Sequence, residues 1–150
     1  MGYSYYWCYK EKATKEQIKK VLEEIRLFEK EFDTKLIIDG YDTTAIQDAK
    51  IDENQIAFTN IYSERKYDNS NELFFLNFNK IVEFNCCKST RNTNYNKILC
   101  LILLSLIRHF EEFYISSDLN LEGWLEISMI YKKIINTKDA LDINLNKFNF

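Results

Sequence analysis

The stretch Ile98-Leu99-Cys100-Leu101-Ile102-Leu103-Leu104-Ser105-Leu106-Ile107 decides the fold, because Ser105 is its only polar residue. A helix that is apolar all round is a buried helix. This run of ten residues is too short to cross a bilayer, which needs about 20. Residues 90–94, just before it, are mostly Thr and Asn, whose side-chain oxygens are typical of helix N-caps. The stretch therefore predicts a buried central helix from Tyr95 to His109.

The whole chain has the composition of a folded protein. Its 150 residues are 46% hydrophobic and 29% charged, which fits one domain with a sizeable core. The net charge of −3 argues against binding to duplex nucleic acid, which relies on a broad basic surface. The N-terminus has no apolar signal region, and the four cysteines match no zinc spacing. We expect a cytoplasmic protein with reduced thiols, without metal or cofactor and without a membrane partner.

Two more helices and several strands are predicted around the buried helix. Residues 14–32 have one apolar stripe, and Thr14 with Gln17 forms a capping box. A third helix begins near Gly123 and ends near Asn136. Strand patterns occupy residues 3–10, 35–38, 55–62, 73–78, 81–87 and 113–116. We therefore predict a single α+β domain over residues 1–150, with an antiparallel sheet of about five strands, one buried central helix and two covering helices.

The tail after the third helix, residues 137–150, is open to three interpretations. From Ala140 onward, apolar residues alternate with Asp and Asn, which is the pattern of a half-buried strand. Such a strand could extend this sheet at its edge or act as an arm that pairs with a second copy in a homo-oligomer. A frayed terminus is the third interpretation.

Positive charge gathers at the start of the buried helix. No Asp or Glu occurs between Phe84 and Phe110, although the chain has 23 acidic residues. A helix N-terminus has unpaired N–H groups and a partial positive charge, so it attracts phosphate or carboxylate. Here the preceding loop supplies the candidate ligand-binding residues Lys88, Ser89, Thr90 and Arg91, and Tyr95 follows one turn later. The alternative is that Ser and Thr cap the helix while Lys88 and Arg91 stay solvated.

Two further groups would complete a ligand site. Ser117 and Asp118 follow a short strand, where Asp118 could hold a ribose hydroxyl or orient the arginine. The alternative is that they form an N-cap or a turn for the third helix. Tyr3 and Trp7 share one face of the first strand, and aromatic faces stack on bases. Core packing would explain the same aromatic face without a ligand.

Nucleophilic catalysis is disfavoured by distance along the chain. His109 is the only histidine, and Cys86 and Cys87 precede the helix that His109 ends. A helix from Tyr95 to His109 is about 21 Å long at 1.5 Å per residue. The thiols and the imidazole therefore lie near opposite ends of the helix, and interaction of His109 with the helix dipole is the simpler interpretation.

Three motifs resemble a family of small bacterial and phage proteins without an assigned function. They are Gly2-Tyr-Ser-Tyr-Tyr-Trp7, the segment from Cys87 to Arg91 ahead of the apolar helix, and Ile115-Ser-Ser-Asp118. The resemblance implies a phage or bacterial setting and names no reaction. Together with the candidate site, it suggests a non-enzymatic protein that binds a phosphate-bearing, nucleotide-like ligand, for example a phage anti-defence sponge for a nucleotide immune signal. A protein–protein inhibitor or oligomeric adaptor, and a small nucleotide hydrolase, are the alternatives.

Overall fold

The computed structural model describes residues 2–39, 46–65, 71–136 and 145–149. Within these ranges the fold is α+β, as predicted. The elements are β1 (Gly2–Tyr9), α1 (Lys15–Glu31), β2 (Leu36–Asp39), β3 (Ile46–Asp48), β4 (Lys50–Ile51), β5 (Gln55–Phe58), β6 (Asn60–Ile61), η1 (Tyr62–Glu64), β7 (Phe74–Asn77), β8 (Val82–Thr90), α2 (Asn94–His109), β9 (Phe113–Ser117), α3 (Leu121–Ile135), η3 (Leu145–Lys147) and β10 (Phe148–Asn149).

The described strands form three hydrogen-bonded sheets, whereas the sequence predicted a single sheet of about five strands. One sheet has the order β10-β9-β1-β8, and the other two have the orders β3-β2-β6 and β4-β5-β7. The predicted strand 55–62 breaks at Thr59, so that β5 and β6 join different sheets. The sequence hides this break because the residues on both sides of it are buried. Thr59 itself donates its N–H to the carbonyl of Ile37 in β2.

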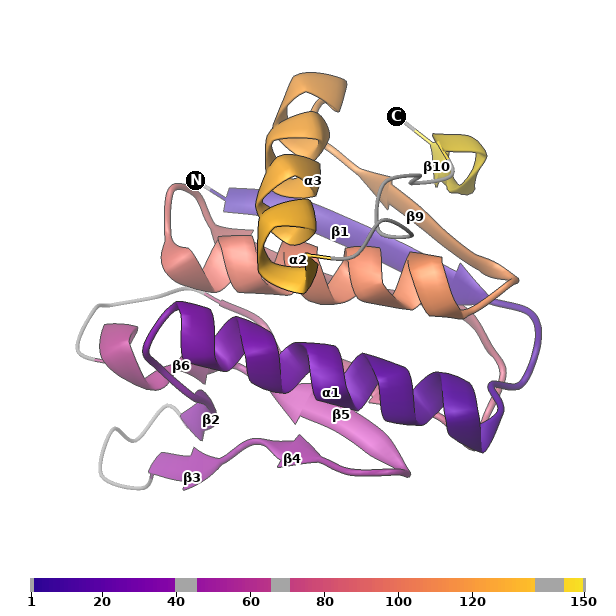
Figure 1. The fold of residues 1–150 in the computed structure, drawn as a ribbon, viewed down its shortest axis with the longest axis horizontal. Coiled ribbons are helices and arrows are strands. Elements are labelled where there is room, and N and C mark those ends of the chain that lie inside the picture. The colour runs from indigo at the N-terminus through magenta and orange to yellow at the C-terminus, as the bar shows by residue number, and fades with distance from the viewer. Residues whose placement is uncertain (1, 40–45, 66–70, 137–144, 150) are drawn as a thin grey trace.

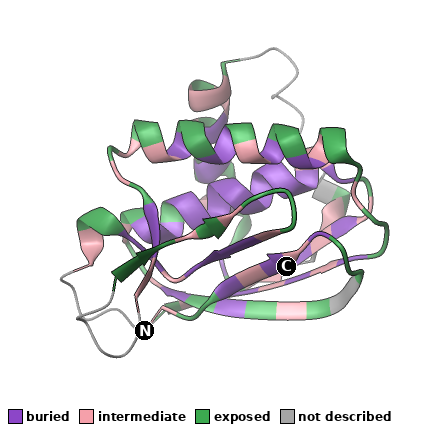
Figure 2. Cartoon of the chain, turned by 90° about the horizontal axis from the view of Figure 1, so that it is seen from below, coloured by how far each residue is buried: buried purple, intermediate pink, exposed green. Residues whose placement is uncertain are grey.

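The buried central helix is confirmed. Every residue of α2 from Ile98 to Ile107 is buried, and Figure 2 shows α2 almost wholly in the colour of buried residues. Thr93 caps its N-terminus by accepting a hydrogen bond from the N–H of Asn96, at 3.1 Å. At the other end the Lys147 amine donates to the carbonyls of Ile107 and Phe110, which satisfies acceptors that a helix end leaves unpaired.

The two covering helices pack on α2. Figure 1 shows α1 and α2 running side by side, with α3 crossing their direction steeply. Thr14 and Gln17 form the predicted capping box at the start of α1. Asn120 caps α3, so Ser117 and Asp118 are not its N-cap. α3 ends at Ile135, and its C-cap residue Asn136 adopts the left-handed conformation that is typical of helix C-termini.

The end of the chain returns to its own sheet. Phe148 and Asn149 form β10, which pairs in parallel with β9. Residues 137–144 and 150, on which most of the predicted tail strand falls, lie outside the described residues. Among the helices of the described ranges, none is both long enough and apolar enough to cross a membrane.

Candidate functional site

A cleft of about 680 Å³ runs along α1. One wall is α1 itself, and the opposite wall is made by the β4–β5 turn and the residues after β7. Figure 1 shows the β4–β5 turn beside the N-terminal half of α1. We call it the α1 cleft. Its lining residues are Lys12, Ala13, Lys15, Ile18, Lys19, Leu22, Glu23, Arg26, Glu53, Asn54, Phe78 and Asn79.

The wall opposite α1 is fixed by hydrogen bonds between two turns. The backbone N–H of Phe78 donates to the carbonyl of Asn54 at 2.9 Å, and the side-chain amide of Asn79 donates to that of Asn54 at 3.2 Å. Asp52 in turn accepts from the N–H groups of Asn54 and Gln55. These hydrogen bonds fix the two turns relative to each other.

The rim of the α1 cleft is basic and its floor is apolar. The rim has four cations, Lys12, Lys15, Lys19 and Arg26, against the two carboxylates Glu23 and Glu53. Among the described residues, the ion pairs involve Lys35, Arg108 and His109, and none of the four cleft cations. Ile18 and Phe78 are buried and form the floor. A chain of net charge −3 thus concentrates a local positive potential over an apolar surface, which favours an anionic ligand with a flat apolar part.

Sequence reasoning missed this cleft because it assigned the polar side of α1 to solvent. A signal was nevertheless present. Lys15, Lys19, Leu22 and Arg26 recur at intervals of four, three and four residues, which places them on one helix face. The opposite wall comes from turns that are distant in the sequence, so no pattern within α1 predicts it.

None of the predicted ligand-binding residues lines the α1 cleft. Lys88 is exposed and pairs with Ser4, so it lies on the outer face of the sheet. Arg91 packs over the ring of Tyr3 at 4.5 Å from its centroid. Tyr3 is in register with the buried Ser89 on the inner face. The two predicted phosphate-holding cations are therefore on different sides of the sheet.

The N-terminus of α2 already holds a carboxylate of the chain. Glu64 accepts hydrogen bonds from the backbone N–H groups of Asn94 and Tyr95, at 3.1 and 3.0 Å. A phosphate would have to displace Glu64 to reach these donors. In the loop, the Ser89 hydroxyl donates to Asn96 and the Thr90 backbone N–H donates to Asn71, while the Thr90 hydroxyl is buried without a hydrogen-bond partner among the described residues. This geometry does not favour the predicted anion site.

The predicted stacking residues divide between core and surface. Trp7 is 1% exposed and stacks on Phe74 with 4.7 Å between ring centroids. Tyr95 is fully buried and packs edge-on against Phe58. Tyr3 remains half-buried under Arg91. Trp7 and Tyr95 therefore build the core and offer no face to a ligand.

Ser117 and Asp118 lie at the same end of the sheet as Lys88, but β1 separates them from it. Asp118 accepts a hydrogen bond from the Ser4 N–H at 2.9 Å, and the Ser117 hydroxyl accepts one from the Leu119 N–H. The Ser117 bond is local, as expected of a turn residue, whereas Asp118 joins the end of β9 to β1.

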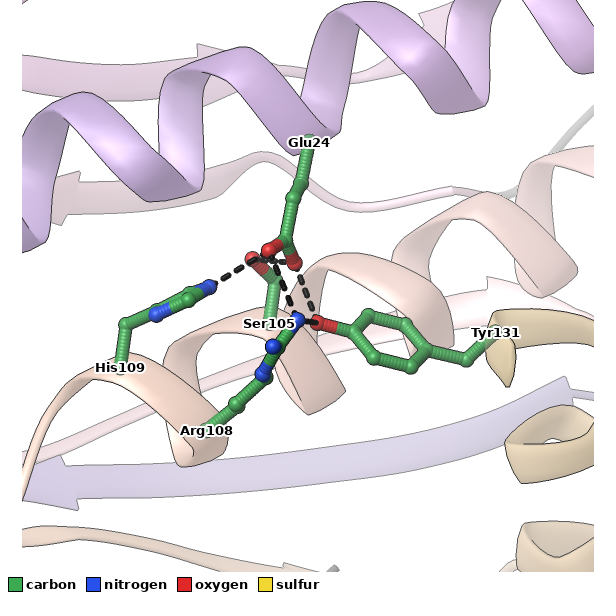
Figure 3. Close-up of polar contacts among 5 residues, drawn as sticks. All are labelled: Glu24, Ser105, Arg108, His109 and Tyr131. Atoms are coloured by element: carbon green, nitrogen blue, oxygen red, sulfur yellow. Dashed lines mark hydrogen bonds and ion pairs between the residues drawn. The ribbon is translucent and has the colours of Figure 1, made fainter. Parts of the chain in front are cut away.

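A second polar cluster, shown in Figure 3, lies between the three helices. The carboxylate of Glu24 on α1 accepts hydrogen bonds from Ser105 at 2.9 Å, from Arg108 at 3.2 Å and from the Tyr131 hydroxyl. The His109 ring contacts it at 2.5 Å. No role for Glu24 was predicted from the sequence. Its place among Val21, Ile25 and Phe28, on the apolar stripe of α1, is the signal that could have indicated a buried carboxylate. The cluster joins α1, α2 and α3 through one buried charge.

Glu24 is held ionised by its partners. Burial raises the pKa of its carboxyl, but hydrogen bonds from His109, Tyr131 and Ser105 and the charge of His109 more than offset burial and lower the pKa below its usual value. Figure 3 shows all four partners converging on the two carboxylate oxygens. Because these oxygens are occupied, we assign the cluster to stability.

The lowered pKa of Glu24 predicts an acid-sensitive fold. The unfolded chain has a Glu pKa of about 4.3, so the stabilisation by Glu24 is fully present above that pH. It is lost as the pH falls through the lower pKa of the folded state. In urea unfolding at pH 7, 5 and 3.5 or below, the stability difference between wild type and Glu24→Gln should shrink at the lowest pH. A difference that stays constant or grows would contradict this assignment.

Of the groups weighed for nucleophilic catalysis, Cys87 is buried and His109 is held by Glu24. Burial raises the pKa of the Cys87 thiol well above its usual value and that of Cys100 to about 12, so both thiols stay protonated at neutral pH. His109 lies at the C-terminal end of α2, as predicted, and its ring also contacts the carboxylate of Glu24. Over the described parts of the chain, no group of three or more His, Cys, Asp or Glu residues is placed to hold a metal ion.

Comparison with known proteins identified no relative of this chain. No family model, no curated protein and no solved structure matches this chain. The resemblance to small bacterial and phage proteins thus stays a prediction, and the functional argument rests on the geometry of the α1 cleft.

Proposed function

We propose that this protein binds a small phosphate-bearing, nucleotide-like ligand in the α1 cleft without converting it. The observation that supports this most is the coincidence, in one cavity, of an apolar floor with four cations that form no ion pair with any described residue. Lys and Arg are the side chains that hold phosphate. The positive end of the α1 dipole lies at the same end of the cleft, since Lys15 is the first residue of α1, and it adds to the attraction.

The spread of the cations favours a ligand with more than one anionic group. Lys15 and Arg26 are eleven residues apart on α1, which corresponds to about 16 Å along the helix. A single phosphate contacts cations within a few ångströms. A nucleoside polyphosphate or a short oligonucleotide places charge along the whole row, while its base reaches the apolar floor beside Phe78.

Binding without turnover fits the side chains of the cleft. The described lining residues include no His, Cys, Ser or Thr, and their only acids are Glu23 and Glu53. These carboxylates are suited to accept hydrogen bonds from ribose hydroxyls. In the phage or bacterial setting that the sequence resemblance implies, such a protein would act as a sponge that sequesters a nucleotide signal.

Thermal denaturation with a ligand panel tests the proposal. Inorganic phosphate, adenosine, ADP, ATP and a short oligonucleotide serve as probes. A bound ligand at 100 times its dissociation constant adds about 2.7 kcal/mol, which raises the melting temperature by roughly 5–10 °C for a domain of this size. Lys15→Glu combined with Lys19→Glu should abolish the rise, because the change turns two attractive charges into repulsive ones.

The matched control is Lys88→Glu combined with Arg91→Glu, which makes the same change of charge outside the cleft. It should leave the ligand-induced rise intact. The proposal fails if no phosphate-bearing probe raises the melting temperature, or if the control removes the rise while the cleft variant keeps it.

The hydrolase alternative has its own test. After incubation with the bound probe, the protein is denatured and the nucleotide is analysed by chromatography. Recovery of intact ligand in stoichiometric amount supports sequestration. Accumulation of hydrolysed product that disappears with Lys15→Glu and Lys19→Glu would make the cleft an active site.

A further inference from the structure

An apolar stripe lies exposed along α3. Leu121, Leu125 and Met129 are 44%, 50% and 70% exposed, and they follow one another at intervals of four residues. Side chains at this spacing share one helix face. The opposite face of α3 is anchored in the core by Trp124 and Tyr131. α3 therefore has an exposed apolar stripe in addition to its buried face, and exposed apolar surface of this kind marks interaction sites.

Charge is distributed unevenly beside this stripe. Glu122 and Glu126 lie in the N-terminal half of α3, and Lys132 and Lys133 lie in its last turn. No ion pair of the described residues involves any of these four side chains. The outer face is thus acidic at one end and basic at the other. Such a surface is complementary to itself when the second helix runs in the opposite direction.

We propose that the chain forms a two-fold symmetric homodimer in which α3 packs antiparallel against α3 of a second copy. A two-fold axis that crosses the outer face of α3 midway between Leu125 and Met129 places Leu125 opposite Met129 of the second copy. The same axis brings Glu122 within reach of Lys132 and Lys133 of that copy, and the symmetry repeats each contact. A parallel pair would instead place Glu beside Glu and Lys beside Lys, which costs free energy.

This interface is limited to one helix face and differs from the tail arm expected from the sequence. Specific interfaces usually bury about 1,200–2,000 Å² in total, and two helices of 15 residues supply less. The dimer should therefore be weak and reversible. It does not involve the α1 cleft, so ligand binding and dimer formation are separable.

Sedimentation velocity from about 1 μM to about 1 mM tests the proposal with the full chain at low salt. Wild type should pass from monomer to dimer over this range. Leu125→Glu combined with Met129→Glu should weaken association at least about tenfold, a change of about 1.4 kcal/mol. The control Leu27→Glu changes a leucine of similar exposure, 43%, on α1 and should leave association unchanged.

Charge exchange tests the antiparallel direction. Glu122→Lys and Lys133→Glu should each weaken the dimer, and the double variant should restore it, because opposite charges face one another again. Circular dichroism checks that each variant is folded. Wild type that stays monomeric at every concentration, a dimer insensitive to the Leu125 and Met129 changes, or a double variant no stronger than the single variants would each overturn the proposal.

Discussion

Glu24→Ala is expected to lower the free energy of unfolding by about 3–5 kcal/mol, the range for removing one partner of a buried charge network. Glu24 is 7% exposed and receives contacts from Ser105, Arg108, His109 and Tyr131. Without the carboxylate these donors lose their common acceptor in a site that water reaches poorly. Urea unfolding at pH 7, followed by circular dichroism, measures the loss.

The neighbouring residue supplies the control for Glu24. Glu23→Ala removes the same side chain one position earlier, from the exposed side of α1. Surface changes of this kind usually alter stability by less than about 0.5 kcal/mol. Equal effects of the two substitutions would mean that the buried cluster does not join the three helices in the way that Figure 3 shows.

Trp7→Ala is expected to cost about 3–5 kcal/mol, the usual range for removing a large aromatic side chain from a core. Trp7 is buried between the four-stranded sheet and Phe74 of β7, so its loss opens a cavity between two sheets. The same denaturation experiment measures it. Ligand binding by the fraction that remains folded should be unchanged.

Tyr6→Ala is the matched control for Trp7. Tyr6 precedes Trp7 in β1 but points to the outer face, where it stacks on the exposed Phe84. Losing that aromatic pair should cost under about 1.5 kcal/mol. If Trp7→Ala were as mild as Tyr6→Ala while abolishing nucleotide binding, Trp7 would be the base-stacking residue that the sequence suggested.

The contrast between Tyr6 and Trp7 also shows what the sequence could predict. Alternation along a strand separates the two faces, so their assignment needs only local information. The same holds for α1, whose apolar spacing and Thr14 cap predict its bounds to within one residue. For α2 the predicted helix from Tyr95 to His109 is also correct to within one residue, although the sequence did not single out Thr93 among the capping residues at 90–94. The strand at residues 55–62 failed because its division at Thr59 depends on which sheet each half joins.

The candidate site could not be predicted in the same way. A cation-rich loop before a helix looks like an anion site until a distant carboxylate occupies the helix N-terminus. Here Glu64 accepts hydrogen bonds from the N–H groups of Asn94 and Tyr95, which lie 30 and 31 positions later in the sequence. The α1 cleft likewise needs the turns at Asn54 and Asn79, which the local pattern of α1 does not reveal. Long-range placement decides both outcomes.

A nuclear magnetic resonance titration with ATP tests the central claim most directly, because it locates the bound ligand residue by residue. We predict saturable shifts of the backbone amides of residues 12–26, 53–54 and 78–79, with those of residues 88–91 and 117–118 unchanged. Shifts confined to residues 88–91 and 117–118, or no saturable shift at any amide, would contradict the assignment of ligand binding to the α1 cleft.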